Sequence, residues 1–564
     1  MNSKEEKVGS ILAGLAHAIH QRYSSRRERF VRTGALRLCR ANAVSHALLL
    51  MSLLVALLGG SWADAKVDPM VQKMSDAIRA GDIRKVRELL ANNPRLANAE
   101  IAWRTRPLHW VVGSGRKDLV ELLLKHGANP NIRDALGYMP VFKAALDEDF
   151  EVMSILCKHG GRFSARSAIH DAAFAGDLAR ARALLKEDPR AANSDGCSHK
   201  WTPLHAAALG GQKRMVEFLL KSGARAEAKG RYGRKALHLA RTSDVARLLV
   251  ASGTDVDSRD SYGYTPLRYA SSSGNREVAL LLLAEGADVN AQPGGGERSA
   301  LHFAVQGGHA ALVELLLNHG ADIEAKQEFS SDADGVTPLL LAAGKGNVEI
   351  VKLLLSKGAD LKATDNNGLT ALSYAARKGN VPLLRVLVAK GLAVNGSAKD
   401  RQVAPPIVLA VGSGNKEAIQ FLLSKGADVD SRIGAASPFE GRSALHVAAV
   451  SSAEMVSLII ASGATVDARD AEGNTPLHAS SSNGQTEAAK LLLTAGAQLN
   501  ATNRAGRTPL HEAAMWGKEE MVRFLLSKGA DKNVVDRRGR TALDWAEERI
   551  WVGVERVLRS HGAK

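Results

Sequence analysis

The feature that most constrains this chain is a short motif that returns at a nearly constant spacing. The string TPLHAA at 202–207 recurs as TPLH at 475–478 and as TPLHEAA at 508–514. From a first weak copy at Gln72 to the last at Thr541, 469 residues contain 14 intervals, a mean period of 33.5. Such a period predicts stacked repeats rather than separate domains, and fifteen units fill residues 66–564. Degenerate copies begin at Arg106, Met139, Ser167, Lys235, Thr265, Ser299, Thr337, Thr370, Pro405, Ser443 and Thr541.

Each unit predicts two short helices and a polar connection. In the unit at 202, Thr202 supplies an N-cap hydroxyl, and Pro203 occupies the first helical position, where its missing N–H costs nothing. A helix over 204–209 is followed by Gly210 and Gly211, and a second apolar face lies over 215–220. Gly223 is suited to a left-handed C-cap, and the polar stretch after it predicts a hairpin. No unit can bury its apolar face alone, so neighbouring units must stack.

The repeated string resembles the ankyrin repeat. The unit at 508–533 carries Thr-Pro-Leu-His-x-Ala-Ala and then a Leu-Leu-x-x-Gly-Ala-Asp-x-Asn ending, and the likeness extends over about 490 residues. The resemblance implies an all-α solenoid of helix-turn-helix units joined by β-hairpin-like loops. It also implies that the concave face and the hairpin tips bind other proteins.

Departures from the pattern predict how the array is divided. The units at Gln72 and Ser167 share a Gly-Asp turn and a later Pro-Arg, so both are interpreted as array-starting units. We therefore predict a short sub-array over 66–166 and a long array over 167–564. The interval from 235 to 265 is only 30 residues and predicts a tightened unit. Two intervals of 38 residues place insertions at the hairpin tips 327–335 and 433–441.

The N-terminal region is typical of a targeting segment. Seven arginines between Arg22 and Arg40 precede an uncharged stretch over 41–63 with a 12-residue apolar centre. Ala63-Asp64-Ala65 then offers small residues where a signal peptidase reads the chain. We expect residues 1–65 to be a signal peptide cleaved near Ala65, which makes the mature protein periplasmic or extracellular. The alternative is an uncleaved single-pass membrane anchor through residues 43–60.

Histidine, cysteine and glycine motifs do not predict an active site. Eight of the predicted first helices offer one histidine each, at least about a repeat away from the next, so no metal site is expected. In the ankyrin repeat this histidine hydrogen-bonds the backbone and the Thr hydroxyl, so the resemblance implies a structural role. Cys157 and Cys197 are interpreted as reduced thiols, with pairing across units as the alternative. We expect no catalytic residues and no cofactor.

Charge limits the kinds of partner. The chain carries +16, of which +5 belongs to residues 1–65 (nine Lys or Arg, four Asp or Glu) and +11 to residues 66–564. This excess is spread out, with its strongest cluster at Arg537, Arg538 and Arg540, so nucleic acid is not the expected ligand. A weak attraction to anionic surfaces and a monomeric state are expected.

Large aromatic side chains mark the candidate binding surface, since aromatic residues are only 4% of the chain and Leu, Val and Ala suffice for the core. Trp, Tyr and Arg are enriched in binding hot spots. The insertion at 327–335 is a second candidate contact, and Trp103 and Trp545 share the pattern. The candidate contacts are Trp110, Trp201, Tyr232, Tyr262, Tyr264, Tyr269, Trp516, Arg537 and Arg538.

Together these features predict a non-catalytic scaffold that binds unidentified partner proteins. Two alternatives stay open: a regulatory or targeting subunit of an enzyme, and a binder of an anionic cell-surface polymer or membrane.

Overall fold

A computed structural model describes residues 68–563, apart from 102–104, 115, 134–138, 147–148, 163–167, 196–199, 293–297, 328–334, 397–403, 436 and 438. The signal-peptide hypothesis for 1–65, with its alternative of an anchor at 43–60, lies outside these residues and stays a prediction. So do Trp103, Cys197 and most of the 327–335 insertion.

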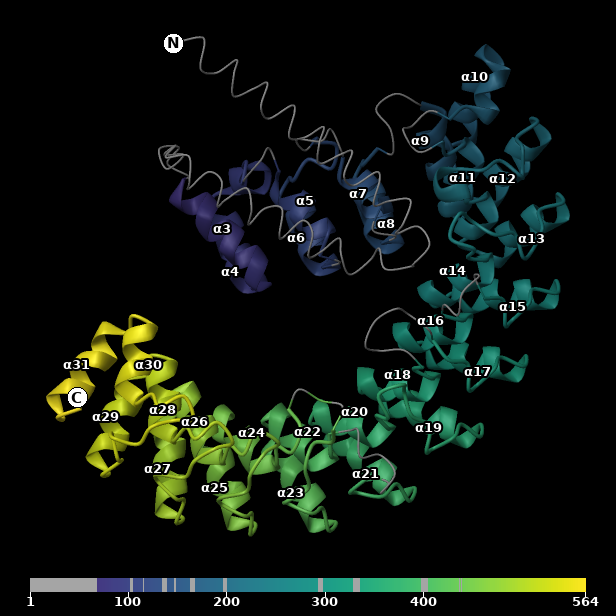
Figure 1. The fold of residues 1–564 in the computed structure, drawn as a ribbon. Helices are drawn as coiled ribbons and strands as arrows, with labels where there is room; N and C mark the ends of the chain where they lie inside the picture. The colour runs from purple at the N-terminus through teal and green to yellow at the C-terminus, as the bar shows by residue number, and fades with distance from the viewer. Residues whose placement is uncertain are drawn as a thin grey trace. The chain divides into compact units, whose positions relative to one another are not determined.

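The chain forms two compact units, divided between Gly294 and Gly295. Figure 1 labels the helices in chain order. The joint expected near 160–170 falls largely on residues outside the description and stays a prediction. The helices of unit 1 are α3 (Pro69–Ala80), α4 (Ile83–Asn92), η1 (Pro94–Asn98), α5 (Pro107–Val112), α6 (Lys117–Lys125), α7 (Pro140–Leu146), α8 (Phe150–Lys158), α9 (Ala168–Ala175), α10 (Leu178–Glu187), η2 (Pro189–Asn193), α11 (Pro203–Leu209), α12 (Lys213–Lys221), η3 (Arg231–Gly233), η4 (Ala236–Leu239), α13 (Ser243–Ala251), α14 (Pro266–Ser273) and α15 (Arg276–Ala284).

Unit 2 repeats the same helix pair eight times. Its helices are α16 (Ala300–Gly307), α17 (Ala310–Asn318), α18 (Pro338–Lys345), α19 (Val348–Ser356), α20 (Ala371–Arg377), α21 (Val381–Ala389), α22 (Pro406–Ser413), α23 (Lys416–Ser424), α24 (Ala444–Ser451), α25 (Ala453–Ala461), α26 (Pro476–Asn483), α27 (Thr486–Thr494), α28 (Pro509–Met515), α29 (Glu519–Ser527), α30 (Ala542–Glu548) and α31 (Val552–Ser560).

The predicted local signals hold at the unit beginning at Thr202. Pro203 is the first residue of α11, and a capping box between Thr202 and His205 caps the N-terminus of this helix. Gly211 (φ 68°) turns the chain into α12, and Gly223 (φ 85°) takes the left-handed conformation expected of it. The described helices form fifteen successive pairs, which confirms the repeat count and the all-α class.

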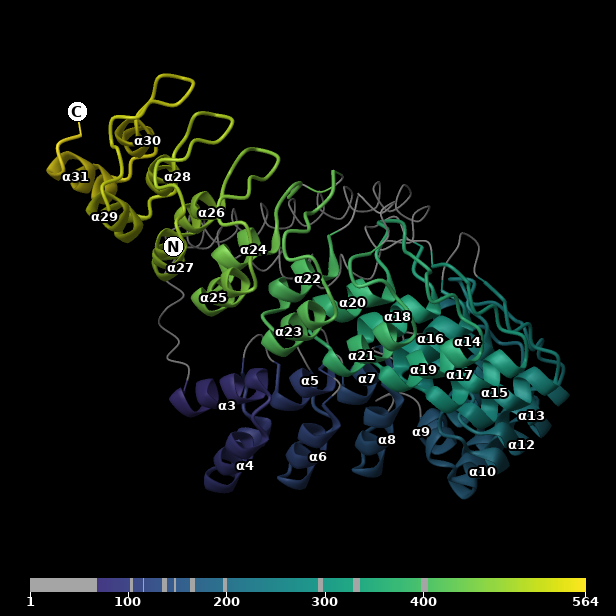
Figure 2. The same cartoon turned by 90° about the horizontal axis from the view of Figure 1, so that it is seen from below.

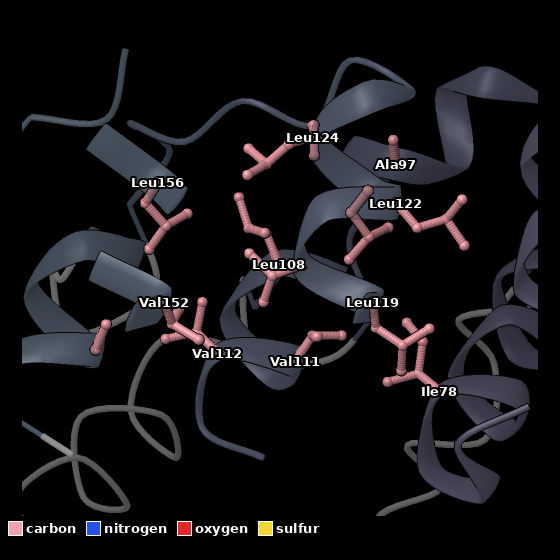
Figure 3. Close-up of a cluster of buried hydrophobic side chains, with 14 of the residues drawn as sticks. Ile78, Ala97, Leu108, Val111, Val112, Leu119, Leu122, Leu124, Val152 and Leu156 are labelled. Carbon is pink, nitrogen blue, oxygen red and sulfur yellow. The ribbon is translucent and has the colours of Figure 1, made fainter. Parts of the chain in front are cut away.

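Stacking of like helices on like helices builds each unit. In unit 2 the first helices of successive pairs contact one another in one row and most second helices in another. The hairpin loops before α26, α28 and α30 project to the same side of these rows (Figure 2). The core lies between the rows and consists mainly of Leu, Val and Ala. Figure 3 shows the core of unit 1 around Leu108, Leu119 and Val152, each at most 1% exposed.

The irregular units also follow the sequence. The tightened unit at 235 has a four-residue 3-10 helix, η4, in place of a full first helix. The two insertions are flanked by antiparallel bridges, Gln327 with Val336 and Arg432 with Ser443, as expected for hairpins. The units at Gln72 and Ser167 each add a 3-10 helix, η1 and η2, after their second helix.

Candidate functional site

The recurring histidines connect each unit to the next. His205 Nδ1 accepts from the Thr202 N–H at 3.1 Å and lies 2.8 Å from its hydroxyl, while Nε2 lies 2.9 Å from the Arg234 carbonyl oxygen of the following unit. The same arrangement recurs at His446, His478 and His511. These bonds confirm the structural role implied by the resemblance.

Burial keeps these imidazoles neutral. It lowers the pKa of His205, His238, His302 and His478 to about 4, with burial as the largest cause each time. Within the described residues, no group of three His, Cys, Asp or Glu side chains is placed to hold a metal ion.

Tyr269 is a core residue rather than an exposed contact. Its ring is 5% exposed and its hydroxyl donates to Asp260 Oδ2 at 2.7 Å. The same bond across nine residues recurs from Tyr374 to Asp365 at 2.8 Å and from Trp545 to Asp536 at 3.0 Å. The hairpin carboxylate therefore fixes an aromatic ring of the first helix. Tyr269 and Trp545 are consequently structural residues and not candidates for the partner-binding surface.

Trp201 is also buried, at 4% exposure, and stacks on His205 with ring centroids 6.4 Å apart. The ring occupies space opened by Gly230, where an added Cβ would lie 2.7 Å from Trp201 Cδ1. Other hairpins carry Asp or Asn at this position, such as Asp260 and Asn503. Trp201 therefore packs in the interior beside Gly230 and is not accessible to a partner.

Trp110 is half-buried and held within its own unit. Its Nε1–H donates to the Thr105 hydroxyl at 2.9 Å, and the Arg79 guanidinium lies 4.8 Å from the ring centroid. The ring also packs against the core of unit 1. Packing within the fold therefore accounts for the presence of a large aromatic side chain at this position.

Tyr232, Tyr262 and Tyr264 form what we call the tyrosine cluster, on two adjacent hairpins. The ring centroids of Tyr232 and Tyr262 are 5.3 Å apart, and those of Tyr262 and Tyr264 are 5.9 Å apart. Tyr262 is 46% exposed, and the other two are partly buried beside it. The cluster brings together three of the predicted contact residues.

Arginines and one buried carboxylate hold this cluster in place. Arg231 lies 4.5 Å from the Tyr232 ring centroid, and Arg268 lies 3.7 Å from that of Tyr264. Asp260 Oδ1 accepts the backbone N–H groups of Tyr262 and Tyr264 at 2.8 and 3.0 Å. The tyrosines are therefore presented on a braced turn and not on a free loop.

Neighbouring hairpins are joined by backbone hydrogen bonds at their tips. The Ser261 N–H donates to the Tyr232 carbonyl at 2.6 Å, and in unit 2 the Arg504 N–H donates to that of Glu472 at 2.9 Å. The Arg537 N–H donates to the Ala505 carbonyl at 2.9 Å. Arg537 and Arg538, two of the residues predicted to contact a partner, lie on the last of these tips and are exposed.

Trp516 is 57% exposed but lies away from the hairpins. It caps the C-terminal end of α28, in the turn that leads to α29. The tyrosine cluster is in unit 1 and Trp516 is in unit 2.

Cys157 is partly buried on α8, and burial raises the pKa of its thiol to about 12. This favours the protonated thiol at neutral pH. The state of the pair with Cys197 stays a prediction.

The fold is a solenoid of stacked helix pairs with projecting hairpins, an architecture typical of tandem-repeat binding proteins. A family model for ankyrin repeats, in sets of three copies, matches residues 74–167, 162–230, 222–293, 294–365, 359–433, 407–503 and 497–553. The chain belongs to the ankyrin repeat family. Its repeats are of a kind that serves in protein interaction and is generally non-catalytic.

Curated relatives share the repeats over part of their length. The chain is 36% identical over 158 residues to a B-cell lymphoma 3 protein homolog of Mus musculus, covering 27% of this chain and 34% of that protein. It is 35% identical over 152 residues to the nuclear factor NF-kappa-B p105 subunit of Gallus gallus, covering 26% and 15%. An ankyrin repeat and KH domain-containing protein of Caenorhabditis briggsae is 33% identical over 286 residues, covering 46% and 11%. The chain thus spans about a third or less of these relatives.

No helix among the described residues combines the length and the apolar composition that crossing a bilayer requires.

Proposed function

We propose that this protein is a non-catalytic scaffold and that the tyrosine cluster is a primary contact for a partner protein. The observation that carries the proposal is the exposed ring of Tyr262 between two further tyrosines on a braced turn. Tyrosine supplies a large, rigid contact area with little loss of conformational entropy. The placement on hairpin tips agrees with the surface that ankyrin repeats use.

The hairpin tips of unit 2 support a second, electrostatic contact. Residues 500–507 and 531–541 contain six Lys or Arg and two Asp or Glu. Arg504, Arg537 and Arg538 are exposed, and none of the ion pairs found in the described residues includes them. An acidic segment of a partner protein is the complementary ligand.

The test is to capture partners on the full chain and measure their affinity for variants. Tyr232→Ala with Tyr262→Ala should weaken binding at least about thirtyfold, or about 2 kcal/mol. Leu280→Ala is the matched control. Leu280 also lies in compact unit 1, on the second helix α15, and is 41% exposed. Normal binding by a folded tyrosine variant would overturn the proposal, as would an equal loss in the control.

Export is a further part of the proposal, supported by the basic and apolar pattern of residues 1–65. An exported scaffold would meet its partners in the periplasm or outside the cell. The alternatives of an enzyme subunit and of a binder of anionic polymer are distinguished by the partner captured.

A further inference from the structure

The turn between α30 and α31 differs from most inter-helix turns of unit 2, which place a glycine at positive φ. At the equivalent position of the two preceding units, Gly484 and Gly517 take φ 73° and 66°. Here the residue is Ile550, with φ 59°. A β-branched side chain is strongly disfavoured in this left-handed region, where glycine is the usual choice.

Ile550 gains no packing that would offset this strain, because it is 79% exposed. A strained residue that does not serve the fold is a reason to look for a function. Three further exposed apolar side chains lie beside it in the chain or in the adjacent turn: Trp516 at 57%, Trp551 at 43% and Val552 at 57%. We call these four residues the apolar edge.

The apolar edge is a fixed surface of two adjacent turns. The Trp551 Nε1–H donates to the Met515 carbonyl at 3.0 Å, which ties the α30–α31 turn to the end of α28. The Trp551 ring also covers Gly517, where a Cβ would lie 2.7 Å from the ring. The edge holds four of the eight large apolar side chains that are exposed in the described residues. Such clustering is typical of a contact surface.

Positive charge surrounds the apolar edge. Lys518 follows Trp516 by two residues, Arg549 precedes Ile550, and Arg556 is one helical turn beyond Val552. None of these three side chains forms an ion pair within the part of the chain that the structure describes.

The nearby carboxylates are mostly neutralised. Glu519 pairs with Arg523 at 2.7 Å, and Glu547 and Glu555 pair with Arg559 at 2.5 and 2.9 Å. Arg559 serves both Glu547 and Glu555, so one of these two carboxylates and the exposed Glu520 oppose the three cations, which leaves a charge of +1. The net charge beside the edge is therefore positive, as it is for the whole chain at +16.

We propose that the apolar edge docks the scaffold on an anionic lipid bilayer, with Trp516, Ile550 and Val552 entering the headgroup region. Tryptophan is enriched at membrane interfaces, and basic residues beside it are attracted to anionic headgroups. Apolar side chains on these turns can enter the lipid headgroup region, while the flanking cations contact anionic headgroups. A second copy of the chain stacked end to end would have to desolvate the Glu547–Arg559–Glu555 cluster, which is costly.

The experiment uses the full chain with vesicles of about 70% phosphatidylcholine, part of it brominated, and about 30% phosphatidylserine. Bromine quenches only tryptophans that enter the bilayer. The Trp516 signal is the difference between the wild type and Trp516→Phe, which keeps the apolar character. We expect that signal to be quenched with phosphatidylserine and to recover when it is left out or when salt is raised.

Ile550→Gly with Val552→Ser should weaken vesicle binding at least about tenfold. Glycine accepts the left-handed conformation, so Ile550→Gly alone should unfold at the same or a higher urea concentration. Phe439→Ser is the matched control, because Phe439 is 51% exposed on a hairpin of the same unit. It should bind vesicles as the wild type does. All variants carry the same residues 1–67, so their differences report on the apolar edge.

Three results would overturn the proposal. One is a Trp516 signal that bromine does not quench, and another is unchanged vesicle binding by the Ile550→Gly and Val552→Ser variant. The third is a concentration-dependent dimer that Ile550→Gly abolishes, which would make the edge a contact between copies. Because the tyrosine cluster is left intact, loss of vesicle binding with normal partner binding separates this proposal from the proposed function.

Discussion

Asp260 shows at the residue scale how one side chain serves several structural roles. It accepts two turn N–H groups and the Tyr269 hydroxyl, and its Oδ2 lies 3.7 Å from Arg234 Nε. Its side chain is buried, so these contacts are not weakened by water. The turn that presents Tyr262 and Tyr264 therefore depends on a buried carboxylate that a partner would not contact.

Removing that carboxylate should destabilise unit 1. Asp260→Ala leaves Arg234 without its buried counter-charge, and we expect a loss of about 3 kcal/mol in the free energy of unfolding. Tyr269→Phe removes one hydrogen bond and should cost about 1 kcal/mol. Urea denaturation measures both. Asp244→Ala, which removes an exposed ion pair with Lys213, should cost less than about 1 kcal/mol. Equal effects of Asp260→Ala and Asp244→Ala would contradict the role of Asp260.

Much of the fold could be predicted from the sequence, but the exposure of single aromatic rings could not. The Thr-Pro-Leu-His string determines its own helix start, so its consequences are local. Trp201 was expected on the surface and is buried, because Gly230 in the next hairpin opens space for its ring. The bond from Tyr269 to Asp260 had a signal in the nine-residue spacing, which Tyr374 and Asp365 repeat.

The histidine bonds at the element scale predict a pH dependence. The pKa of His205, His238, His302 and His478 falls from 6.5 to about 4 on folding. The unfolded chain therefore binds more protons between about pH 6.5 and about pH 4, and stability falls as pH falls through that window. Each histidine contributes up to about 1.4 kcal/mol per pH unit. The urea midpoint should drop between pH 7 and pH 5. A midpoint that stays constant until below pH 4 would contradict this assignment.

The irregular units predict uneven stability along the array. Stability in a solenoid is set largely by contacts between neighbours, so units with short or interrupted helices are the weak places. The unit at 235 has the four-residue helix η4, and the unit at 139 matches the repeat poorly. Hydrogen exchange should be fastest over 139–166 and 235–264, and urea unfolding should show more than one transition. A single sharp unfolding transition with uniform protection from hydrogen exchange would contradict uneven stability along the array.

At the scale of the whole molecule, the expected N-terminal processing is tested by sequencing the protein from its native host. Cleavage after Ala65 should give Lys66-Val67-Asp68 as the mature N-terminus, because Ala63 and Ala65 are the small residues that signal peptidase requires. A full-length product in the cytosol would contradict export. A full-length product retained in the membrane would favour the anchor at 43–60.

The surfaces proposed for partner binding and for membrane docking belong to different compact units. The tyrosine cluster belongs to unit 1 and the apolar edge to unit 2, and each is held by contacts within its own unit. Because the two surfaces share no residues, variants of one should leave the other unchanged.

The central claim, that the tyrosine cluster contacts a partner protein, is tested most directly by site-specific photo-crosslinking. A photoreactive phenylalanine derivative replaces Tyr262 in one version of the full chain and Leu280 in the other, both exposed in unit 1. We expect a covalent adduct with a partner protein from position 262 and none from position 280. An adduct from 280 alone, or equal adducts from both positions, would contradict it.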